Sequence, residues 1–318
     1  MAEFDLIARI RARTASTRAD VVLGIGDDAA LLQPSAHEHL VVAMDTLNAG
    51  VHFPEETAPA DIGWKALAVN LSDIAAMGAR PAWCTLSLSL PQADAAWVDG
   101  FLDGFCALAD GHDVALVGGD TTRGPLSVCV AVHGFVEPGR AMRRDGARVD
   151  DLVWVTGTLG DAAGALAQSR ARQKAIDPVL RARLDRPQPR IAVGRALAGI
   201  AHACIDVSDG LLADLGHVCA ASGVGAEVSL DTLPWTEALR AHFDPDARRM
   251  LQATGGDDYE LCFTAPASTR DAVARIAQDT GVQIVRIGRI VTGSGVQAFD
   301  ADGDAWRAPR KGHEHFAD

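Results

Sequence analysis

The chain has 318 residues, a formal net charge of −13 at pH 7 and 48% hydrophobic residues. This length allows two domains with sizeable cores, and the apolar content excludes a disordered chain. The acidic balance argues against non-specific nucleic-acid binding, which needs clustered Lys and Arg. No apolar run approaches the roughly 18 residues of a membrane-spanning helix. Neither nucleic acid nor a membrane is therefore expected as a partner.

The N-terminus and the cysteines both indicate a cytoplasmic protein. The first residues, MAEFDLIARIRART, predict a short amphipathic helix and not a signal peptide. The six cysteines, at positions 84, 106, 129, 204, 219 and 262, lie far apart without a C-x-x-C pair. They favour free thiols in a reducing cytoplasm over disulfides or a zinc site.

Strand-like and helix-like segments alternate along the first half of the chain. Short β-branched or apolar runs predict strands, and apolar residues at helical spacing predict helices. In chain order we expect strands at 21–25 and 40–44, a helix at 60–77, a strand at 83–90, a helix at 93–110, and strands at 114–117 and 126–136.

A polar segment at 137–146, with three arginines and several breaker residues, indicates a domain boundary. The second half begins again with a strand at 152–156, a Gly-rich turn and a helix. The segment 186–189, with two prolines, interrupts the helical region that follows, and later strands are expected at 203–207, 226–230, 261–264 and 284–290. The pattern predicts two α/β domains of similar size, 1–138 and 139–318.

Small residues followed by aspartate recur beside the apolar segments. They occur at Gly26-Asp27-Asp28, Ser72-Asp73, Gly119-Asp120, Ser208-Asp209-Gly210 and Gly256-Asp257-Asp258. Glycine lets a backbone or a ligand approach closely, and aspartate places an anionic oxygen there. Asp73 is the most informative, because it lies inside an apolar helical stretch. A partly buried carboxylate costs several kcal/mol unless it is paired or bound to a metal.

Hard oxygen ligands suit Mg²⁺ or Ca²⁺. An EF-hand loop is absent from the sequence, and carboxylates scattered over the whole chain suit a composite site better than one loop. Mg²⁺ usually bridges a few carboxylates to substrate phosphates. The aspartates therefore predict a Mg²⁺-dependent enzyme of phosphate chemistry, although the P-loop and protein-kinase signatures are both missing.

Two other classes of protein remain open at this point. The segment 24–29 fits G-x-G-x-x-A, and Asp45 follows at nearly the distance of a ribose-binding carboxylate, as in a nicotinamide oxidoreductase. That match is weak, because two adjacent carboxylates would repel a pyrophosphate. A non-catalytic protein that binds nucleotide or metal is the other class.

Seven motifs occur in this order along the chain and allow a more specific assignment: GIGDDAALL, DTLNAGVHF, KALAVNLSDIAAMGARP, GGDTTRGPLSV, IDVSDGLLADLGH, GGDDYELCF and KGHEHF. Together they resemble the thiamine-monophosphate kinase family, over nearly the whole chain. The resemblance implies the two-domain fold of the aminoimidazole-ribotide synthetase superfamily, with mixed sheets packed with helices. It implies ATP- and Mg²⁺-dependent, in-line phosphorylation of thiamine monophosphate to thiamine diphosphate. A different ATP-dependent activity of the superfamily, such as aminoimidazole-ribotide synthesis, is the nearest alternative.

The resemblance also assigns roles to the two domains. The N-terminal domain would bind ATP and several Mg²⁺ ions and pair into a homodimer, and the C-terminal domain would complete the nucleotide and substrate site. A general base is not expected. Matched position by position, the expected metal ligands are Asp28, Asp45, Asp73, Asp120, Asp206 and Asp209; the ATP contacts are Gly119, Asp120, Arg144 and Ser208; the substrate contacts are His52, Asp257 and His313.

The sequence departs from the family pattern at three places. Ala43 and Met44 stand where hydroxyl residues often help to hold metal, and Asp257 stands where glutamate is usual. His313 replaces a large aromatic residue.

Overall fold

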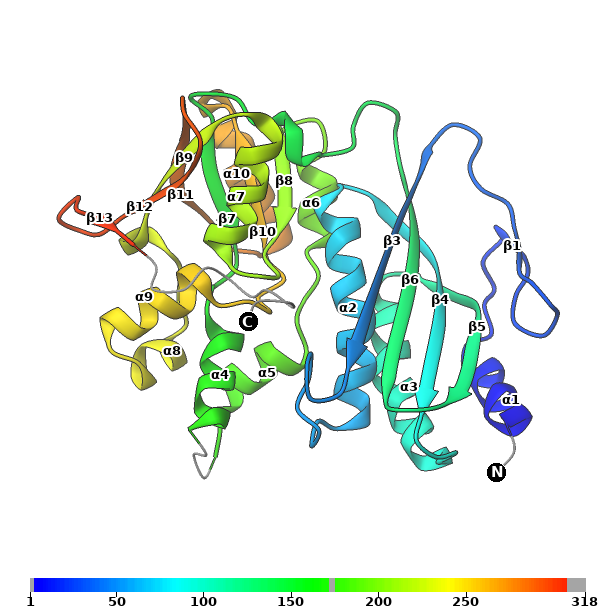
Figure 1. The fold of residues 1–318 in the computed structure, drawn as a ribbon. Coiled ribbons are helices and arrows are strands. Elements are labelled where there is room, and N and C mark those ends of the chain that lie inside the picture. Colours follow the sequence, from blue (N-terminus) through cyan, green and yellow to red (C-terminus); the bar gives the residue numbers. More distant parts are fainter. Residues whose placement is uncertain (1–2, 172–174, 308–318) are drawn as a thin grey trace. The chain divides into compact units, whose positions relative to one another are not determined.

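The computed structural model describes residues 3–171 and 175–307, and the chain divides into two compact units (Figure 1). Unit 1 runs to Ile74 and continues over Ala79–Pro138; unit 2 comprises Ala75–Gly78 and the chain from Gly139 onward. Both units combine helices with a sheet, which confirms the predicted mixed α/β class. Within the described ranges, every helix is too short or too polar to cross a membrane.

Unit 1 is built on a four-stranded sheet with the order β3-β6-β4-β5, in which only β4 and β5 run parallel. A separate antiparallel ribbon is formed by β1 and β2. The elements are α1 (Glu3–Arg13), β1 (Val21–Leu23), β2 (Leu31–Leu32), β3 (His39–Asn48), α2 (Pro59–Ala76), β4 (Arg80–Leu90), α3 (Ala95–Gly111), β5 (Ala115–Arg123) and β6 (Ser127–Val136).

Helices α2 and α3 cover one face of this sheet (Figure 1). The apolar residues of α2 that the spacing predicts are buried, and strand residues such as Leu86 and Val130 are buried as well. The two helices cross closely at Gly104, where a Cβ atom would lie 1.7 Å from the carbonyl oxygen of Ala60. Glycine is therefore needed at position 104 for this packing. Asp94 caps the N-terminus of α3 by accepting hydrogen bonds from two backbone amides.

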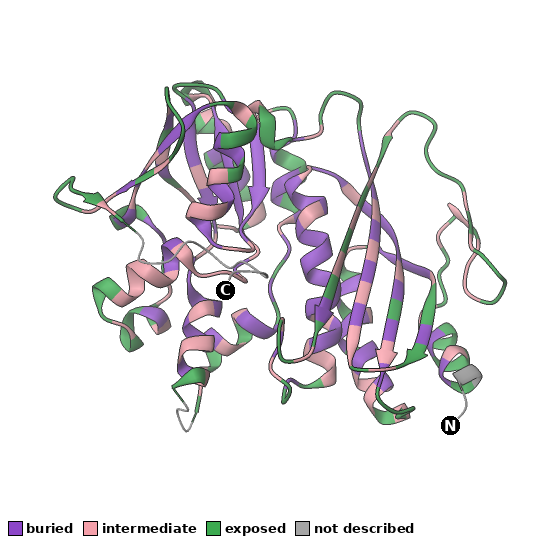
Figure 2. Ribbon diagram, viewed as in Figure 1, coloured by how far each residue is buried: buried purple, intermediate pink, exposed green. Residues whose placement is uncertain are grey.

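The other face of the unit 1 sheet is not covered by α2 or α3. At one end, Val21 and Leu32 of the β1–β2 ribbon pack against Trp83 and Phe135. The remainder, which we call the open face, includes three exposed apolar residues of the edge strand β3 and the strand residues beside them. Figure 2 shows exposed positions along β3. From β3 it includes Leu40, Val42, Met44 and Thr46, and from β6 it includes Cys129 and Ala131.

Unit 2 contains a seven-stranded sheet with the order β13-β12-β9-β11-β7-β10-β8, antiparallel except for the pair β12 and β9. Its helices are α4 (Asp161–Arg170), α5 (Pro178–Asp185), α6 (Ile191–Leu197), α7 (Leu211–Ser222), α8 (Glu237–His242), α9 (Pro245–Thr254) and α10 (Arg270–Thr280), with short 3₁₀ turns η1 (Arg144–Gly146), η2 (Leu230–Thr232) and η3 (Ala267–Thr269). Its strands are β7 (Leu152–Thr156), β8 (Ala203–Asp206), β9 (Gly225–Ser229), β10 (Leu261–Ala265), β11 (Ile284–Val291), β12 (Gly295–Phe299) and β13 (Ala305–Trp306).

The core of unit 2 lies between this sheet and α7. Leu211, Leu215 and Val218 of α7 belong to one buried cluster with strand residues such as Val155 and Ile205. A second, smaller cluster joins α4, α5 and α8. The helix α7 ends at Gly223 in the left-handed conformation, which glycine adopts without a steric penalty.

Two strands of unit 1 continue past the C-terminal ends that the sequence predicts. Strand β3 continues past Met44 to Asn48 because all ten of its residues pair with β6. Strand β5 continues through Gly118, Gly119 and Asp120 to Arg123 because β4 offers a continuous parallel partner. Asp45 and Asp120 therefore lie within strands and do not follow them, which corrects the expectation that aspartates close these segments.

Candidate functional site

Within unit 1, the candidate site residues considered first lie on β3 and α2. The side-chain oxygen of Asn70 on α2 accepts a hydrogen bond of 3.0 Å from the backbone amide of Asp45 on β3. Asp73 lies three residues further along α2 and therefore on the same side of the helix as Asn70. The structure thus brings Asp45 and Asp73, two of the expected metal ligands, to adjoining elements.

Burial raises the pKa of the Asp45 carboxyl above its ordinary value. This shift marks a carboxylate that is partly removed from water, and a bound cation would offset the cost. Near Asp45 along the chain, the backbone carbonyl of His52 accepts a hydrogen bond of 3.0 Å from the Nζ of Lys65, which is buried. The Nδ1 of His52 accepts a hydrogen bond from the backbone amide of Asn48, so the neutral ring carries its proton on Nε2.

Asp27 and Asp28 lie in the turn of the β1–β2 ribbon, and both are exposed. The apolar flanks of this segment form the ribbon strands, and the carboxylates themselves project into water. A strand and not a helix follows the G-x-G-x-x-A segment, whereas a dinucleotide fingerprint needs a strand, a tight turn and a helix N-terminus. The structure therefore removes the basis for the nicotinamide oxidoreductase alternative.

Asp120 and Asp45 lie on opposite faces of the unit 1 sheet. In register, Asp120 pairs with Ser87 of β4, while Asp45 shares a face with Leu86. Because successive strand residues point to opposite faces, Asp45 is on the helix-covered side and Asp120 on the other. At Gly119 a Cβ atom would lie 1.8 Å from the Leu86 carbonyl oxygen, so strand packing by itself requires glycine there.

In unit 2 the expected residues lie on the loop between β8 and α7. Asp206 is the last residue of β8 and is buried, and Ser208 and Asp209 follow it. The backbone amides of Ser208, Asp209 and Gly210 all donate to one carboxylate oxygen of Asp214, at 3.0, 3.1 and 3.0 Å. Asp214 therefore fixes the conformation of the loop that presents Ser208 and Asp209.

The surroundings of Asp214 are strongly negative. Burial, followed by the nearby charges of Asp206 and Asp209, raises its pKa to about 7. Carboxylates this close repel one another, and a cation with oxygen ligands would relieve the repulsion. The donor set at this loop thus fits a hard divalent ion such as Mg²⁺.

A second loop, residues 255–260, lies against the first one. The amide of Asp257 donates to the carbonyl of Ser208 at 2.9 Å, and the amide of Tyr259 donates to the carbonyl of Val207 at 2.8 Å. In turn, the amide of Val207 donates to the carbonyl of Glu260 at 2.8 Å. The expected substrate contact Asp257 is thereby joined through the backbone to the loop of expected metal and ATP contacts.

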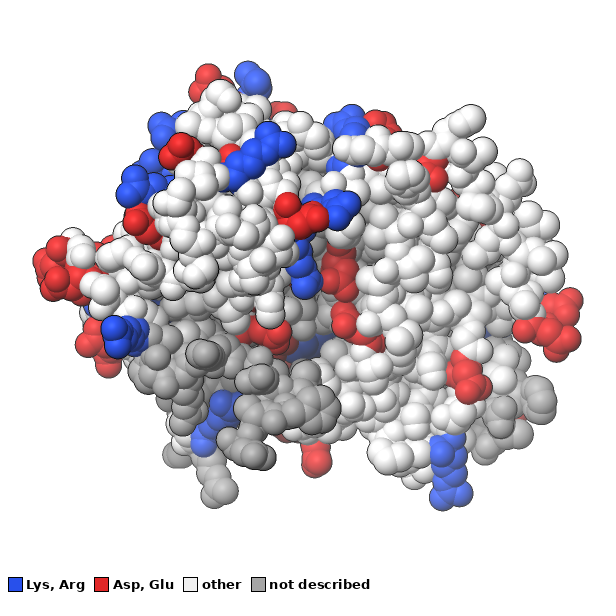
Figure 3. All heavy atoms as spheres, turned by 45° about the horizontal axis from the view of Figure 1, so that its top comes forward, with Lys and Arg blue, Asp and Glu red and all other residues white. Residues whose placement is uncertain are grey.

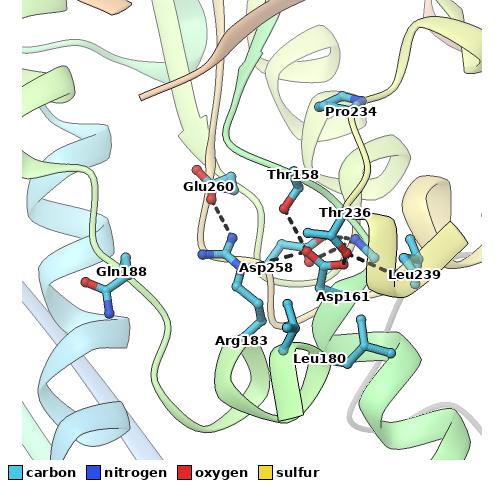
Figure 4. Close-up of polar contacts among 12 residues, drawn as sticks. Thr158, Asp161, Leu180, Arg183, Gln188, Pro234, Thr236, Leu239, Asp258 and Glu260 are labelled. Carbon is cyan, nitrogen blue, oxygen red and sulfur yellow. Dashed lines mark hydrogen bonds and ion pairs between the residues drawn. The ribbon is translucent and has the colours of Figure 1, made fainter. Parts of the chain in front are cut away.

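Buried ionic contacts anchor this second loop (Figure 4). Glu260, which has no exposed surface, accepts from Thr156 and pairs with Arg183 and Arg190. Asp258 is 3% exposed, and both of its carboxylate oxygens lie 3.0 Å from the backbone nitrogen of Gly160 and accept a hydrogen bond from it. These contacts tie the loop to β7, α5 and the starts of α4 and α6.

Two other expected residues are not placed at these loops. The backbone carbonyl of Arg144 accepts a hydrogen bond from Ser222 at the C-terminal end of α7, whereas Ser208 precedes the N-terminal end of that helix. The backbone carbonyl of the preceding residue, Arg143, accepts a hydrogen bond from the backbone amide of Cys204 near the start of β8, whereas Asp206 is the last residue of that strand. The backbone of Arg144 is thus at the far ends of both elements. His313 lies outside the described residues.

Across residues 3–171 and 175–307, three or more His, Cys, Asp or Glu side chains nowhere converge into a ready-made metal site. The expected ligands are instead distributed as the pairs and loops described above. Acidic and basic side chains are interspersed over the face of the molecule in Figure 3. The donors present are carboxylates, which suit a metal that completes its coordination with water and phosphate.

Three residues near these sites were missed from the sequence. Asn70 lies one turn before Asp73, and this spacing indicates that both side chains lie on the same side of α2. Asp214 lies four residues after Gly210, where a carboxylate reaches back to the amides that precede a helix. Tyr259 carried no recognisable pattern, because its role arises from an unusual backbone conformation.

Comparison with family models gives two matches. Residues 26–136 match "AIR synthase related protein, N-terminal domain", and residues 148–301 match "AIR synthase related protein, C-terminal domain". Together these matches cover most of the chain and agree with the fold that the sequence predicts.

Individual proteins that are similar to this chain indicate one family among those that share these two domains. Thiamine-monophosphate kinase of Escherichia coli K12 is 47% identical over 320 residues, covering 99% of this chain and 98% of that protein. The crystal structure of thiamine-monophosphate kinase from Stenotrophomonas maltophilia K279a is 58% identical, with a TM-score of 0.89 and coverage of 96% of this chain and 98% of that one. A structure described as "AaThiL complexed with AMPPCP and TMP" is 32% identical, with a TM-score of 0.79 and coverage of 99% and 97%.

Proposed function

The chain belongs to the thiamine-monophosphate kinase family, and from this membership we propose that it transfers the γ-phosphoryl group of ATP to thiamine monophosphate, giving thiamine diphosphate and ADP. The neighbour described as complexed with AMPPCP and TMP supports this pair of substrates. The structural observation that supports the proposal is the backbone hydrogen bond between Asp257 and Ser208, because we assign these two residues to acceptor and nucleotide binding.

The chemistry needs alignment more than proton transfer. The attacking atom is a phosphate oxygen of thiamine monophosphate, whose second pKa is about 6, so it is largely deprotonated at neutral pH. A general base is therefore not required. The chain contributes by orienting both phosphate groups and by placing carboxylates where metal ions neutralise their charge.

We assign the metal-binding role to carboxylates of both units. In unit 1 they are Asp28, Asp45, Asp73 and Asp120, and in unit 2 they are Asp206 and Asp209. When bound, Mg²⁺ would offset the charge of the phosphates and hold them for in-line transfer. Gly119, Asp120, Arg144 and Ser208 are proposed to contact ATP, and His52, Asp257 and His313 to contact thiamine monophosphate.

We further propose a homodimer formed through the open face of unit 1. Leu40, Val42 and Met44 are 49%, 58% and 65% exposed, and they form an apolar stripe on an edge strand. A second copy of the chain is the occupant that the family resemblance implies, and such a stripe suits a self-complementary interface. The cytoplasm is the proposed location, supported by six free cysteines.

An ADP-release assay tests the reaction. We expect ADP with ATP, Mg²⁺ and thiamine monophosphate, with thiamine diphosphate identified by chromatography. Thiamine and an aminoimidazole-ribotide precursor should give no ADP above background. Turnover with the ribotide precursor would support the rival superfamily activity, and ATP binding without turnover on any acceptor would support a non-catalytic protein.

A further inference from the structure

Two residues of the 255–260 loop have a backbone conformation that side chains rarely adopt. Asp257 has a φ of 68° and Tyr259 a φ of 50°, and neither is glycine. A bulky aromatic residue at positive φ is a marked outlier, because its Cβ crowds the following carbonyl. Such strain persists only where the surroundings enforce it, and it is concentrated at functional sites.

The surroundings here enforce it through the alternate residues of the loop. Asp258 and Glu260 point into the protein and are held by Gly160, Thr156, Arg183 and Arg190, as described above. Asp257 and Tyr259, in contrast, are half-buried. The buried pair thus serves as the anchor, whereas the strained pair keeps part of its surface exposed.

The two strained side chains contact each other. The phenol oxygen of Tyr259 donates a hydrogen bond of 3.1 Å to Oδ1 of Asp257. Both backbones are also bonded to the loop of Val207 and Ser208. The hydroxyl therefore restricts the rotation of a carboxylate that already has a fixed backbone, and it does so next to the expected nucleotide contact.

We propose that Tyr259 is a positioning residue that aims the Asp257 carboxylate at the cationic and amino-bearing ring system of the acceptor. This proposal rests on the proposed function. A carboxylate suits the positively charged thiazolium of the acceptor, and ATP carries no such cationic ring. The glutamate usual at this position reaches one methylene further, so the shorter Asp257 depends more on being held in one direction. Tyr259 accordingly sets specificity for the acceptor and not the rate of phosphoryl transfer.

The substitution Tyr259→Phe tests this role, because it removes only the hydroxyl. We expect the KM for thiamine monophosphate to rise by about tenfold, the loss of one hydrogen bond to a charged group, with the KM for ATP and kcat nearly unchanged. Asp257→Asn should raise the same KM, and the double variant should be no worse than Asp257→Asn alone, since the two residues act together. An unchanged KM for thiamine monophosphate, or an equal rise in both KM values, would overturn the proposal.

A matched control is Asp258→Ala in the same loop. It removes an anchor, so we expect a lower melting temperature and weaker use of both substrates. If Tyr259→Phe behaves like this control, its role is structural and the proposal is wrong. Wild-type protein that makes no thiamine diphosphate would instead refute the proposed function, so the two failures are distinguishable.

A spectroscopic readout is also accessible because Tyr259 is the only tyrosine in the chain. With isotope-labelled tyrosine, the ring gives one NMR signal. That signal should shift when thiamine monophosphate is added and should move much less with a non-hydrolysable ATP analogue alone. A larger response to the nucleotide than to the acceptor would contradict an acceptor-specific role.

Discussion

Asp73 lies on a helix whose neighbouring side chains are mostly apolar and buried. Asparagine has nearly the same shape, so Asp73→Asn should fold normally and lose the negative charge that a metal ion needs. We expect turnover to fall by about 100-fold or more, with little change in melting temperature. Steady-state kinetics across a Mg²⁺ series give the measurement.

Asp302→Asn is the control for this substitution, because Asp302 is an exposed turn residue outside the candidate site. It should keep wild-type kinetics. The metal-binding role of Asp73 is wrong if Asp73→Asn retains wild-type turnover when Mg²⁺ is limiting.

Asp258 provides a prediction on pH. Burial raises its pKa well above 3.8, so the folded protein keeps a proton that the unfolded chain has already lost. The stability from this group is complete below pH 3.8 and declines as the pH rises toward the folded pKa. Asp258→Asn lacks this decline. As the pH rises, the free energy of unfolding of the variant should therefore increase relative to that of the wild type, by up to about 1.4 kcal/mol per pH unit.

Urea unfolding of both proteins in EDTA, at pH 4.5 and 7.5, measures this difference. A gap between the two proteins that is the same at both pH values would show that Asp258 does not change its protonation on folding.

At the level of single residues, the sequence indicates candidate side chains better than it indicates the contacts that hold them. The aspartates beside small residues were recognisable because charge in an apolar context is costly. Their supports were not, because Asn70 and Asp214 act through backbone amides that come together only in the folded chain. The left-handed backbone of Tyr259 likewise depends on anchors far away in sequence.

Among the elements, the predicted helix at 60–77 and strand at 152–156 agree closely with α2 and β7, because apolar spacing alone defines them. Strands β3 and β5 were underestimated at their polar ends, where hydrogen bonds to a neighbouring strand replace the hydrophobic pattern. The short strands β12 and β13 and the helices α7 to α10 were not predicted. Their amphipathic segments are short, and their ends are set by contacts within unit 2.

Strand β3 carries the prediction on assembly. Lysine at position 42 is well tolerated on an exposed strand position of a monomer, but in a dimer it would bury charge in an apolar interface. Val42→Lys should therefore convert dimer to monomer in analytical ultracentrifugation, without loss of secondary structure.

Val149→Lys is the matched control, because Val149 is also an exposed valine but belongs to unit 2. It should leave the dimer intact. Wild-type protein that sediments as a monomer at micromolar concentration would contradict the proposed homodimer.

For the molecule as a whole, the fold class and the family agree with the sequence analysis. The assigned metal ligands stay predictions. They are divided between two units, and oxygen atoms of water and phosphate would complete the coordination of each metal. Because the proposed coordination is incomplete without those oxygen atoms, sequence spacing alone cannot reveal it.

This partial site predicts how ligands affect overall stability. ATP with Mg²⁺ should raise the melting temperature, since a ligand at 100 times its Kd stabilises the folded state by about 2.7 kcal/mol. EDTA should remove most of that increase, and NAD should cause none. An equal shift by ATP in the presence of EDTA would argue against metal-assisted binding.

Cys129 on the open face offers an intrinsic chemical reporter of assembly. Cys84, Cys204 and Cys262 are buried, and burial raises the pKa of each thiol, so alkylating reagents will reach them slowly. Cys129 is partly accessible and sits beside Thr46 in the middle of that sheet. Mass spectrometry of briefly alkylated protein should thus show Cys129 labelling that diminishes with increasing protein concentration, giving a footprint of self-association without any mutation.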